Sequence, residues 1–226
     1  MAQFYRIMRT ITNGTRADKP TLVVATTSTG KKNEFSLLLA DENWTVSFVD
    51  AFIPDGSSFT PPEETGASYR ENAQIKARAL ASLLPKTGEY FALADDSGIE
   101  VEALPHMFGV RSSRQYDGST REKNEFLLRD LQNKNNRTAR YMCALCLIEV
   151  QSGEEWMFYG SLDGKIAEAL SGDEGFGFDP LLIPDGHTRT FAQLGSDIKN
   201  EISHRAKAVK EMKTFLQTYI KKGKND

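Results

Sequence analysis

The sequence is short of cysteine, of long apolar runs and of surplus positive charge. Its 226 residues include 28 Lys and Arg against 31 Asp and Glu, for a formal net charge of −3. No apolar run approaches the roughly 20 residues that a helix needs to cross a bilayer. Proteins that hold duplex nucleic acid use many basic side chains to displace counterions from the phosphates. The composition therefore disfavours a membrane or nucleic-acid partner, but a few local Lys and Arg could still hold a small anion.

Only two cysteines are present, Cys143 and Cys146. Their Cys-x-x-Cys spacing occurs in redox motifs and in one half of a zinc site. Both residues, however, lie within the apolar run Tyr141–Val150, which predicts a buried strand, and the sequence has no second cysteine pair. We therefore predict buried structural thiols in a reducing compartment, the cytoplasm.

The N-terminal segment differs in charge from the rest of the chain. Its first 20 residues carry four basic side chains against one acidic one: Arg6, Arg9, Arg16 and Lys19 against Asp18. This composition is faintly like an organelle transit segment, but the apolar centre of a secretory signal is missing. We predict a flexible extension over residues 1–20 and a single two-lobed domain over residues 21–222.

Hydrophobic periodicity predicts alternating strands and helices. Leu22–Ala25 predicts a strand, followed by a polar loop and a helix with Phe35 and Leu39 on one face. A second helix begins near Ser68, and Lys76 interrupts its apolar stripe. The other predicted elements are strands at Phe91–Ala94, Tyr141–Val150, Trp156–Gly160 and Lys165–Ala169, turns at Ser152-Gly153 and Asp163-Gly164, a helix at Arg121–Leu131, and one long C-terminal helix with its N-cap at Ser196. This order predicts an α/β fold, with a mixed twisted sheet and two lobes around a central cleft.

A cluster of hydroxyl side chains precedes the first predicted helix. The run Thr26-Thr27-Ser28-Thr29-Gly30-Lys31 combines hydroxyls, a glycine and a lysine at a helix N-terminus, where free backbone N–H groups bind anions. The spacing is not that of a Walker A loop. Two interpretations stay open: a phosphate cradle, or Ser and Thr residues that only cap the helix and form the turn.

Acidic residues occur at two places that could hold a hard cation. Asp95-Asp96-Ser97-Gly98 follows the predicted strand Phe91–Ala94, and sites in α/β sheets gather outside the carboxyl ends of strands. Adjacent side chains on an extended segment point opposite ways, so one aspartate faces the cleft while the other caps the turn. Glu64, in Glu63-Glu64-Thr65-Gly66, together with Asp96 would supply the one or two carboxylates that Mg²⁺ takes beside phosphate oxygens. The alternatives are plain turn chemistry and a solvated acidic loop.

Two further segments suit a flat, polar ligand. In Gly175-Phe176-Gly177-Phe178-Asp179-Pro180, glycines on either side of an aromatic ring let a base approach closely, and Asp179 could accept from a purine ring N–H. The same residues could equally form a sharp turn with core aromatics. The second segment clusters four polar side chains near the start of the long helix: Lys199, Ser203, His204 and Arg205. Such a cluster favours an anion or a carbonyl oxygen.

Taken in order, these segments resemble the inosine/xanthosine triphosphate pyrophosphatase family. The resemblance covers about residues 21–220. It rests on five matches: Ala-Thr-Thr-Ser-Thr-Gly-Lys (25–31); Glu-Glu-Thr-Gly (63–66) with Glu-Asn-Ala-Gln-Ile-Lys-Ala (71–77); Ala-Asp-Asp-Ser-Gly-Ile-Glu-Val (94–101); Gly-Phe-Gly-Phe-Asp-Pro (175–180); and Ile-Ser-His-Arg (202–205). One departure is Ser28, where the family usually has Asn, and a shorter side chain changes the contacts offered to phosphate.

The resemblance implies an enzyme that hydrolyses non-standard purine nucleoside triphosphates (ITP, dITP and XTP) to the monophosphate and pyrophosphate. It implies Mg²⁺, or Mn²⁺ in its place, and a homodimer. Asp96 is the expected catalytic base, with Glu64, Asp96 and Asp95 as metal-site residues. The expected substrate-binding residues are Thr26, Ser28, Lys31, Lys76, Ser97, Arg114, Phe176, Gly177, Phe178, Asp179, Lys199, Ser203, His204 and Arg205. Two alternatives are a related pyrophosphatase for modified pyrimidine nucleotides and a nucleotide sensor without turnover.

Overall fold

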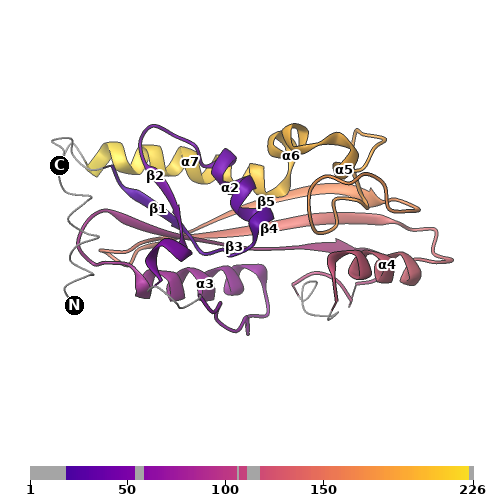
Figure 1. Cartoon of the computed structure of the whole chain (residues 1–226), viewed down its shortest axis with the longest axis horizontal. Coiled ribbons are helices and arrows are strands. Elements are labelled where there is room, and N and C mark those ends of the chain that lie inside the picture. Colours follow the sequence, from indigo (N-terminus) through magenta and orange to yellow (C-terminus); the bar gives the residue numbers. More distant parts are fainter. Residues whose placement is uncertain (1–18, 54–58, 106, 111–117, 224–226) are drawn as a thin grey trace.

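A computed structural model describes residues 19–53, 59–105, 107–110 and 118–223 (Figure 1). Its centre is a six-stranded mixed sheet in the order β2-β1-β3-β4-β5-β6. The strands are β1 (Thr21–Val24), β2 (Thr45–Phe48), β3 (Tyr90–Val101), β4 (Thr138–Glu149), β5 (Glu155–Ile166) and β6 (Leu182–Pro184). The helices are α2 (Thr29–Leu38), the 3-10 helix η1 (Val49–Phe52), α3 (Tyr69–Leu83), α4 (Thr120–Asp130), α5 (Phe191–Leu194), α6 (Ser196–Ile202) and α7 (His204–Gly223).

The sheet has a short parallel part and a long antiparallel part. β1 runs parallel to β2 and to β3, whereas β3, β4 and β5 form antiparallel ladders. β1 pairs with β3 only from Tyr90 to Leu93, so β3 continues beyond the end of its parallel neighbour. α2 and α3 lie beside the parallel part, and α4, α5 and α6 lie toward the other end of the long strands (Figure 1). The predicted mixed α/β fold is therefore confirmed.

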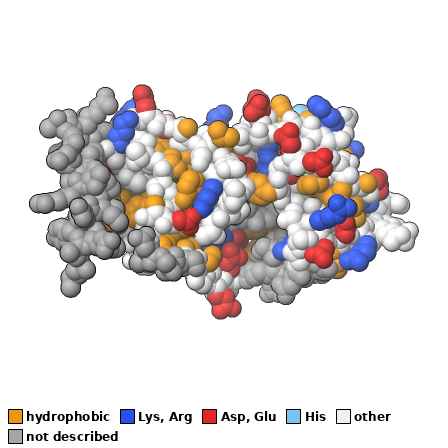
Figure 2. All heavy atoms as spheres, viewed as in Figure 1, with side chains coloured by type: hydrophobic (Ala, Val, Ile, Leu, Met, Phe, Trp, Pro, Cys, Tyr) orange, Lys and Arg blue, Asp and Glu red, His pale blue; other side chains and the backbone are white. Residues whose placement is uncertain are grey.

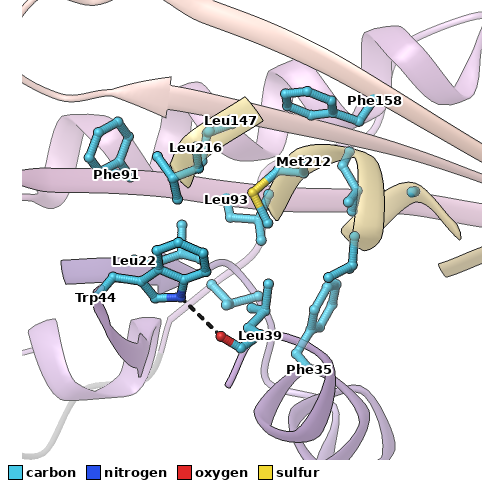
Figure 3. Close-up of a cluster of buried hydrophobic side chains, with 14 of the residues drawn as sticks. Leu22, Phe35, Leu39, Trp44, Phe91, Leu93, Leu147, Phe158, Met212 and Leu216 are labelled. Atoms are coloured by element: carbon cyan, nitrogen blue, oxygen red, sulfur yellow. Dashed lines mark hydrogen bonds between the residues drawn. The ribbon is translucent and has the colours of Figure 1, made fainter. Parts of the chain in front are cut away.

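Helices cover both faces of the sheet, and alternation along β3 sorts its side chains between them. Leu93 belongs to a core cluster with side chains of β1, α2 and α7, among them Phe35 and Met212 (Figure 3). In this cluster the Trp44 indole donates to the Leu39 carbonyl at 2.9 Å. Ala94 belongs to a second cluster, on the α3 side. Since successive side chains on a strand alternate, the aspartates that follow must lie on opposite faces.

Two strand predictions are wrong in the same way. The Asp95–Gly98 segment does not end a strand, because β3 pairs with β4 as far as Val101. Likewise the Asp163-Gly164 dipeptide forms no turn, because β5 runs unbroken from Glu155 to Ile166. At Gly164 the backbone of β6 comes so close that a Cβ would fall 2.4 Å from the Ile183 carbonyl oxygen. This glycine therefore permits a close strand contact inside the sheet.

The prediction of a single long C-terminal helix is also wrong. Ser203 is extended, with φ −65° and ψ 161°, and divides the segment into α6 and α7. Its hydroxyl accepts from the Ala206 N–H at 3.1 Å, as an N-cap does for a new helix. The N-cap of α6 is Gly195, with φ 86°, and Ser196 is the first helical residue. Four elements were not predicted from the sequence: β2, η1, β6 and α5.

The cysteine prediction is confirmed for burial. Cys143 and Cys146 are free and buried in β4, and they belong to clusters on opposite faces of the sheet. Burial raises the pKa of each thiol to about 12.

On the surface, acidic and basic side chains are interspersed over the viewed face (Figure 2). Within the described ranges, no helix has the length and apolar character to cross a membrane.

Candidate active site

The hydroxyl-rich loop leads into α2 just beyond the end of β1. Ser28 is the N-cap of α2, and its hydroxyl lies 3.5 Å from the Lys31 N–H. The Ser28 N–H in turn donates to the Thr26 hydroxyl at 3.3 Å. Capping therefore occurs, as one interpretation predicted. It does not exclude the other, because the remaining N–H groups at the start of α2 still make a helix N-terminus that attracts anions.

Asp95 holds together the face of β3 that meets α2 and α7. Both of its oxygens lie 2.9 Å from the Lys31 ammonium, and its Oδ2 also accepts from Arg205 at 2.9 Å. Ser97 donates to the same oxygen at 3.1 Å. Arg205 completes the network with Glu34 at 2.5 Å. Burial alone would raise the pKa of Asp95, but the Lys31 and Arg205 charges hold it below its ordinary value, so Asp95 is a paired carboxylate.

Asp96 faces the opposite side of the sheet, toward α3. Its Oδ1 lies 2.8 Å from the Lys76 ammonium, which also contacts Glu64 at 2.9 Å. Its Oδ2 accepts from the Asn72 amide at 3.1 Å, and Asn72 accepts from the Gly66 N–H at 2.9 Å. These contacts tie the acidic loop to α3 and to β3. Burial raises the pKa of Asp96, although the Lys76 charge acts in the opposite direction. The Lys76 ammonium is therefore buried between two carboxylates.

The two carboxylates of Glu64 and Asp96 suit a magnesium ion better than a transition metal. Both contact one ammonium group, so they converge on a point that already holds a positive charge. Among the residues that the structure describes, no group of three His, Cys, Asp or Glu side chains forms a complete metal site. Mg²⁺ commonly takes only one or two carboxylates and fills its other positions with water and phosphate oxygens. The donors present fit that requirement.

The glycine-rich loop, residues 175–180, folds against α6 and against the first turn of α2. Asp179 accepts from the Phe176 N–H at 2.8 Å and from the Lys199 ammonium at 2.6 Å. The ammonium also lies 3.9 Å from the centre of the Phe176 ring. A Cβ on Gly30 would fall 2.7 Å from that ring, and one on Gly175 would fall 2.3 Å from the Asp179 carboxylate. Both glycines are therefore needed for these close approaches.

A cavity of about 210 Å³ lies between Lys31, the glycine-rich loop and the start of α7. Nine of the predicted residues line it: Lys31, Ser97, Phe176, Gly177, Phe178, Asp179, Lys199, His204 and Arg205. Lys31 comes from the Thr26–Lys31 segment, which was predicted as a phosphate cradle, whereas Phe176 and His204 come from the segments predicted to hold a base. The structure therefore brings the two kinds of segment to one space, over a separation in sequence of more than 140 residues.

Sequence reasoning missed five residues of this cavity: Gly98, Thr120, Lys123, Asn124 and Tyr141. Tyr141 stacks on His204, with ring centres 4.5 Å apart and an angle of 19° between the planes. Asn124 donates to the Gly177 carbonyl at 3.0 Å. The only signal for Asn124 was an amide inside a predicted helix, where Asn is a poor helix former. Tyr141 gave no signal beyond its place at the start of an apolar run.

Among the described residues, several buried polar atoms of the cavity lining find no hydrogen-bond partner. They are Asp179 Oδ1, His204 Nδ1, Arg205 Nε and Asn124 Oδ1. Buried polar groups are normally paired, so a cluster of exceptions indicates a polar ligand. Burial, with the nearby charges of Arg205 and Lys199, holds the pKa of His204 well below its ordinary value. His204 is therefore a neutral imidazole, and the lining offers both donors and acceptors to a heterocycle.

Comparison with known proteins identifies the family to which this chain belongs. The family model described as the Ham1 family matches residues 22–215. The chain belongs to the Ham1 family.

Curated relatives of this Ham1 family chain are named dITP/XTP pyrophosphatases. One from Deinococcus deserti is 40% identical over 191 residues, which are 83% of this chain and 85% of the relative. One from Listeria monocytogenes serotype 4b is 38% identical, over 89% of this chain and 97% of the relative. Among solved structures, the Staphylococcus aureus Ham1 protein matches with a TM-score of 0.75 and 34% identity, over 88% of this chain and 99% of its own.

Of the predicted residues that the structure describes, seven do not line the cavity of this Ham1 family member: Thr26, Ser28, Glu64, Lys76, Asp95, Asp96 and Ser203. Arg114 lies outside the described residues. Ser203 is fully buried and caps α7, as described above. Asp95 has both oxygens engaged by Lys31 and Arg205, on the opposite face from Asp96, so the structure does not bring it to the Glu64 carboxylate. Arg205 does line the cavity, but its two terminal nitrogens already donate to Glu34, Asp95 and Ser97, and its Nε has no partner among the described residues.

Proposed function

We propose that this protein hydrolyses non-standard purine nucleoside triphosphates, namely ITP, dITP and XTP, to the monophosphate and pyrophosphate. Membership of the Ham1 family and the dITP/XTP pyrophosphatase names of its relatives support this assignment. The observation that carries it is the shared cavity. A phosphate-loop lysine, an aromatic ring and four unpartnered polar atoms of the kind that recognise a purine edge all belong to its lining.

The reaction needs positioning and charge neutralisation more than covalent chemistry. Water attacks the α-phosphorus, the bond from that phosphorus to its bridging oxygen breaks, and pyrophosphate leaves. Asp96 accepts the proton of the attacking water, and the raised pKa that burial gives its carboxyl suits a general base. Lys31 and Lys76 neutralise phosphate oxygens, while Thr26, Ser28 and the free N–H groups of α2 orient them.

The cofactor in this proposal is Mg²⁺, with Mn²⁺ as a substitute, held by Glu64 and Asp96. When bound, such an ion supplies charge neutralisation for the phosphate groups. Two carboxylates are too few to enclose a cation, so substrate oxygens and waters must complete its shell. We therefore expect metal affinity to rise when nucleotide is present.

Base selection belongs to the other end of the cavity. Phe176 stacks on the base, while Asp179, Lys199, His204 and Arg205 meet its edge. Because His204 is neutral, it contributes a hydrogen bond rather than a charge. Arg205 contributes through Nε, which has no partner among the described residues, whereas both terminal nitrogens already donate to Glu34, Asp95 or Ser97. A site that leaves buried polar groups unpaired rejects the wrong base strongly.

The setting of the enzyme is also part of the proposal. We expect a homodimer in the cytoplasm that acts on small nucleotides and needs no nucleic-acid partner. The near-balanced charge of the chain supports the last point. Size-exclusion chromatography with light scattering measures the subunit number directly.

A coupled pyrophosphate assay tests the reaction. Wild-type protein is given ITP, XTP, dITP, ATP or GTP, with and without Mg²⁺, and the products are separated by chromatography. ITP should yield IMP and pyrophosphate in equal amounts, and only when Mg²⁺ is present. The Asp96→Asn variant serves as the matched control for contaminating phosphatase. If IDP and orthophosphate appear first, attack is at the γ-phosphorus and the proposal is wrong.

A further inference from the structure

Asn124 is a buried amide in the wall of the cavity, contributed by the second turn of α4. Its side chain donates through Nδ2 to the Gly177 carbonyl at 3.0 Å, and its buried Oδ1 has no hydrogen-bond partner in the described parts of the chain. Because a carbonyl can only accept, the amide nitrogen must face Gly177. The amide oxygen is therefore left as an acceptor at the side of the loop that carries Phe176.

The half-paired Asn124 amide does not increase the stability of the fold. Asn is a poor residue for the interior of a helix. A buried acceptor without a partner is also unfavourable, whereas an apolar side chain of similar size would avoid that cost. Apolar residues occupy the next two buried positions of this segment, Leu127 and Leu131. The half-paired amide among them indicates a hydrogen-bond donor that comes from outside the chain.

We propose that Asn124 is a specificity-determining residue whose Oδ1 accepts a hydrogen bond from a ring N–H of a 6-oxopurine. The inference rests on the proposed function and deepens it. The relatives' names pair dITP, which lacks the 2′-hydroxyl, with XTP, which has it. The 2′-hydroxyl is thus no common donor, whereas both bases carry N–H at position 1.

The same contact would discriminate against adenine. Position 1 of adenine carries a lone pair and no hydrogen, so the Asn124 oxygen would face another acceptor. A buried acceptor opposite an acceptor leaves both groups unpaired, which is the strongest form of rejection available to such a site. Guanine also carries N–H at position 1, so Asn124 would not by itself exclude GTP.

The test uses the full-length protein and two readouts. Binding of IMP, XMP and AMP is measured by titration calorimetry, and kcat/KM is measured for ITP, XTP and ATP. Asn124→Leu, which keeps the volume but removes both polar groups, should weaken IMP and XMP by about 5- to 100-fold. AMP should lose only the support that the Asn124 donor gives the Gly177 loop, and IMP should weaken further than AMP by about 5-fold or more, so that the IMP-to-AMP affinity ratio falls.

Two more variants separate base recognition from support of the loop. Asn124→Asp keeps an acceptor but loses the amide donor to Gly177, so it should weaken IMP and AMP alike and retain their ratio. Asn135→Ala, in the exposed segment after α4, is the matched control and should change nothing. If Asn124→Leu does not fold, Asn124→Ala is judged by the same ratio.

The outcomes decide between the two proposals. An equal loss for IMP and AMP in Asn124→Leu, or no loss, overturns the role of Asn124 while leaving the pyrophosphatase function standing. A wild-type protein that neither prefers IMP to AMP nor cleaves ITP overturns both. A selective loss of IMP and XMP in a variant with wild-type melting temperature supports base recognition, because a purely structural role would lower that temperature instead.

Discussion

Neighbouring aspartates on β3 should fail in different ways when each is replaced by asparagine. Asp95 is buried between Lys31 and Arg205, and the buried Arg205 also pairs with Glu34. Asp95→Asn therefore leaves buried charge uncompensated. Removing one partner from a buried ion pair typically costs about 3–5 kcal/mol of the free energy of unfolding. We expect a loss of that size.

Asp96→Asn should cost less stability and far more activity. Lys76 keeps Glu64 as a partner in this variant, and the raised pKa of Asp96 shows that burial penalises its charge. We expect a loss of no more than about 2 kcal/mol in the free energy of unfolding. A positioned general base is worth about 10²- to 10⁴-fold in rate, so kcat for ITP should fall by that factor.

Two measurements on the same samples test this contrast. Urea unfolding, followed by the fluorescence of Trp44 and Trp156, gives the free energy of unfolding. Pyrophosphate release at saturating ITP and Mg²⁺ gives kcat of the folded protein. If Asp96→Asn keeps its kcat while Asp95→Asn loses it, the general base is Asp95. If both variants lose equal stability, the assignment of the two aspartates to opposite faces is wrong.

Three further predictions concern the base site and the core. Phe176→Ala should lower kcat/KM for ITP, XTP and ATP by a similar factor, worth about 1–3 kcal/mol, because stacking does not depend on the base edge; a loss confined to ITP would contradict stacking. The lowered pKa keeps His204 neutral in the folded protein, whereas in the unfolded chain this residue takes up a proton below pH ~6.5. The free energy of unfolding should therefore fall as the pH is lowered from 6.5 to 5, by up to about 1.4 kcal/mol per pH unit through this residue. Urea unfolding should show a shallower dependence on pH for His204→Gln than for the wild type, and equal slopes would mean that folded His204 titrates normally. The thiols of Cys143 and Cys146, with pKa values raised to about 12, should not react with a disulfide reagent at pH 8 until urea unfolds the protein, and rapid reaction in the folded state would refute their burial.

Much of the fold could be predicted because its signals are local. An apolar stripe at helical spacing placed α3, and the polar interruption at Lys76 is a buried ammonium paired with Glu64 and Asp96. Alternation on an extended segment predicted that Asp95 and Asp96 would face apart, which their separate partners confirm. A hydroxyl-rich run before an apolar helical pattern predicted a helix start near Gly30-Lys31, and Ser28 of that run is the N-cap of α2.

Strand ends and helix breaks could not be predicted, because pairing partners decide them. The Asp-Ser-Gly and Asp-Gly sequences favour turns in isolation, yet β3 and β5 continue through them, since β4 offers hydrogen bonds along both strands. Gly164 is a strand residue because β6 crosses close to it. The break at Ser203 likewise depends on capping of α7 by a side chain that also suited a continuous helix.

From the residues and their resemblance to a known family, the sequence by itself determined which segments would carry the chemistry and in what order, because those motifs are short and contiguous. Only the tertiary structure decided their partners. The Arg205 guanidinium meets Glu34 across 171 positions of sequence and spends on ion pairs the nitrogens that the sequence suggested for a base. Asn124 enters the cavity from a helix without any motif. Contacts of this kind depend on where the chain returns in space, and no local periodicity records that.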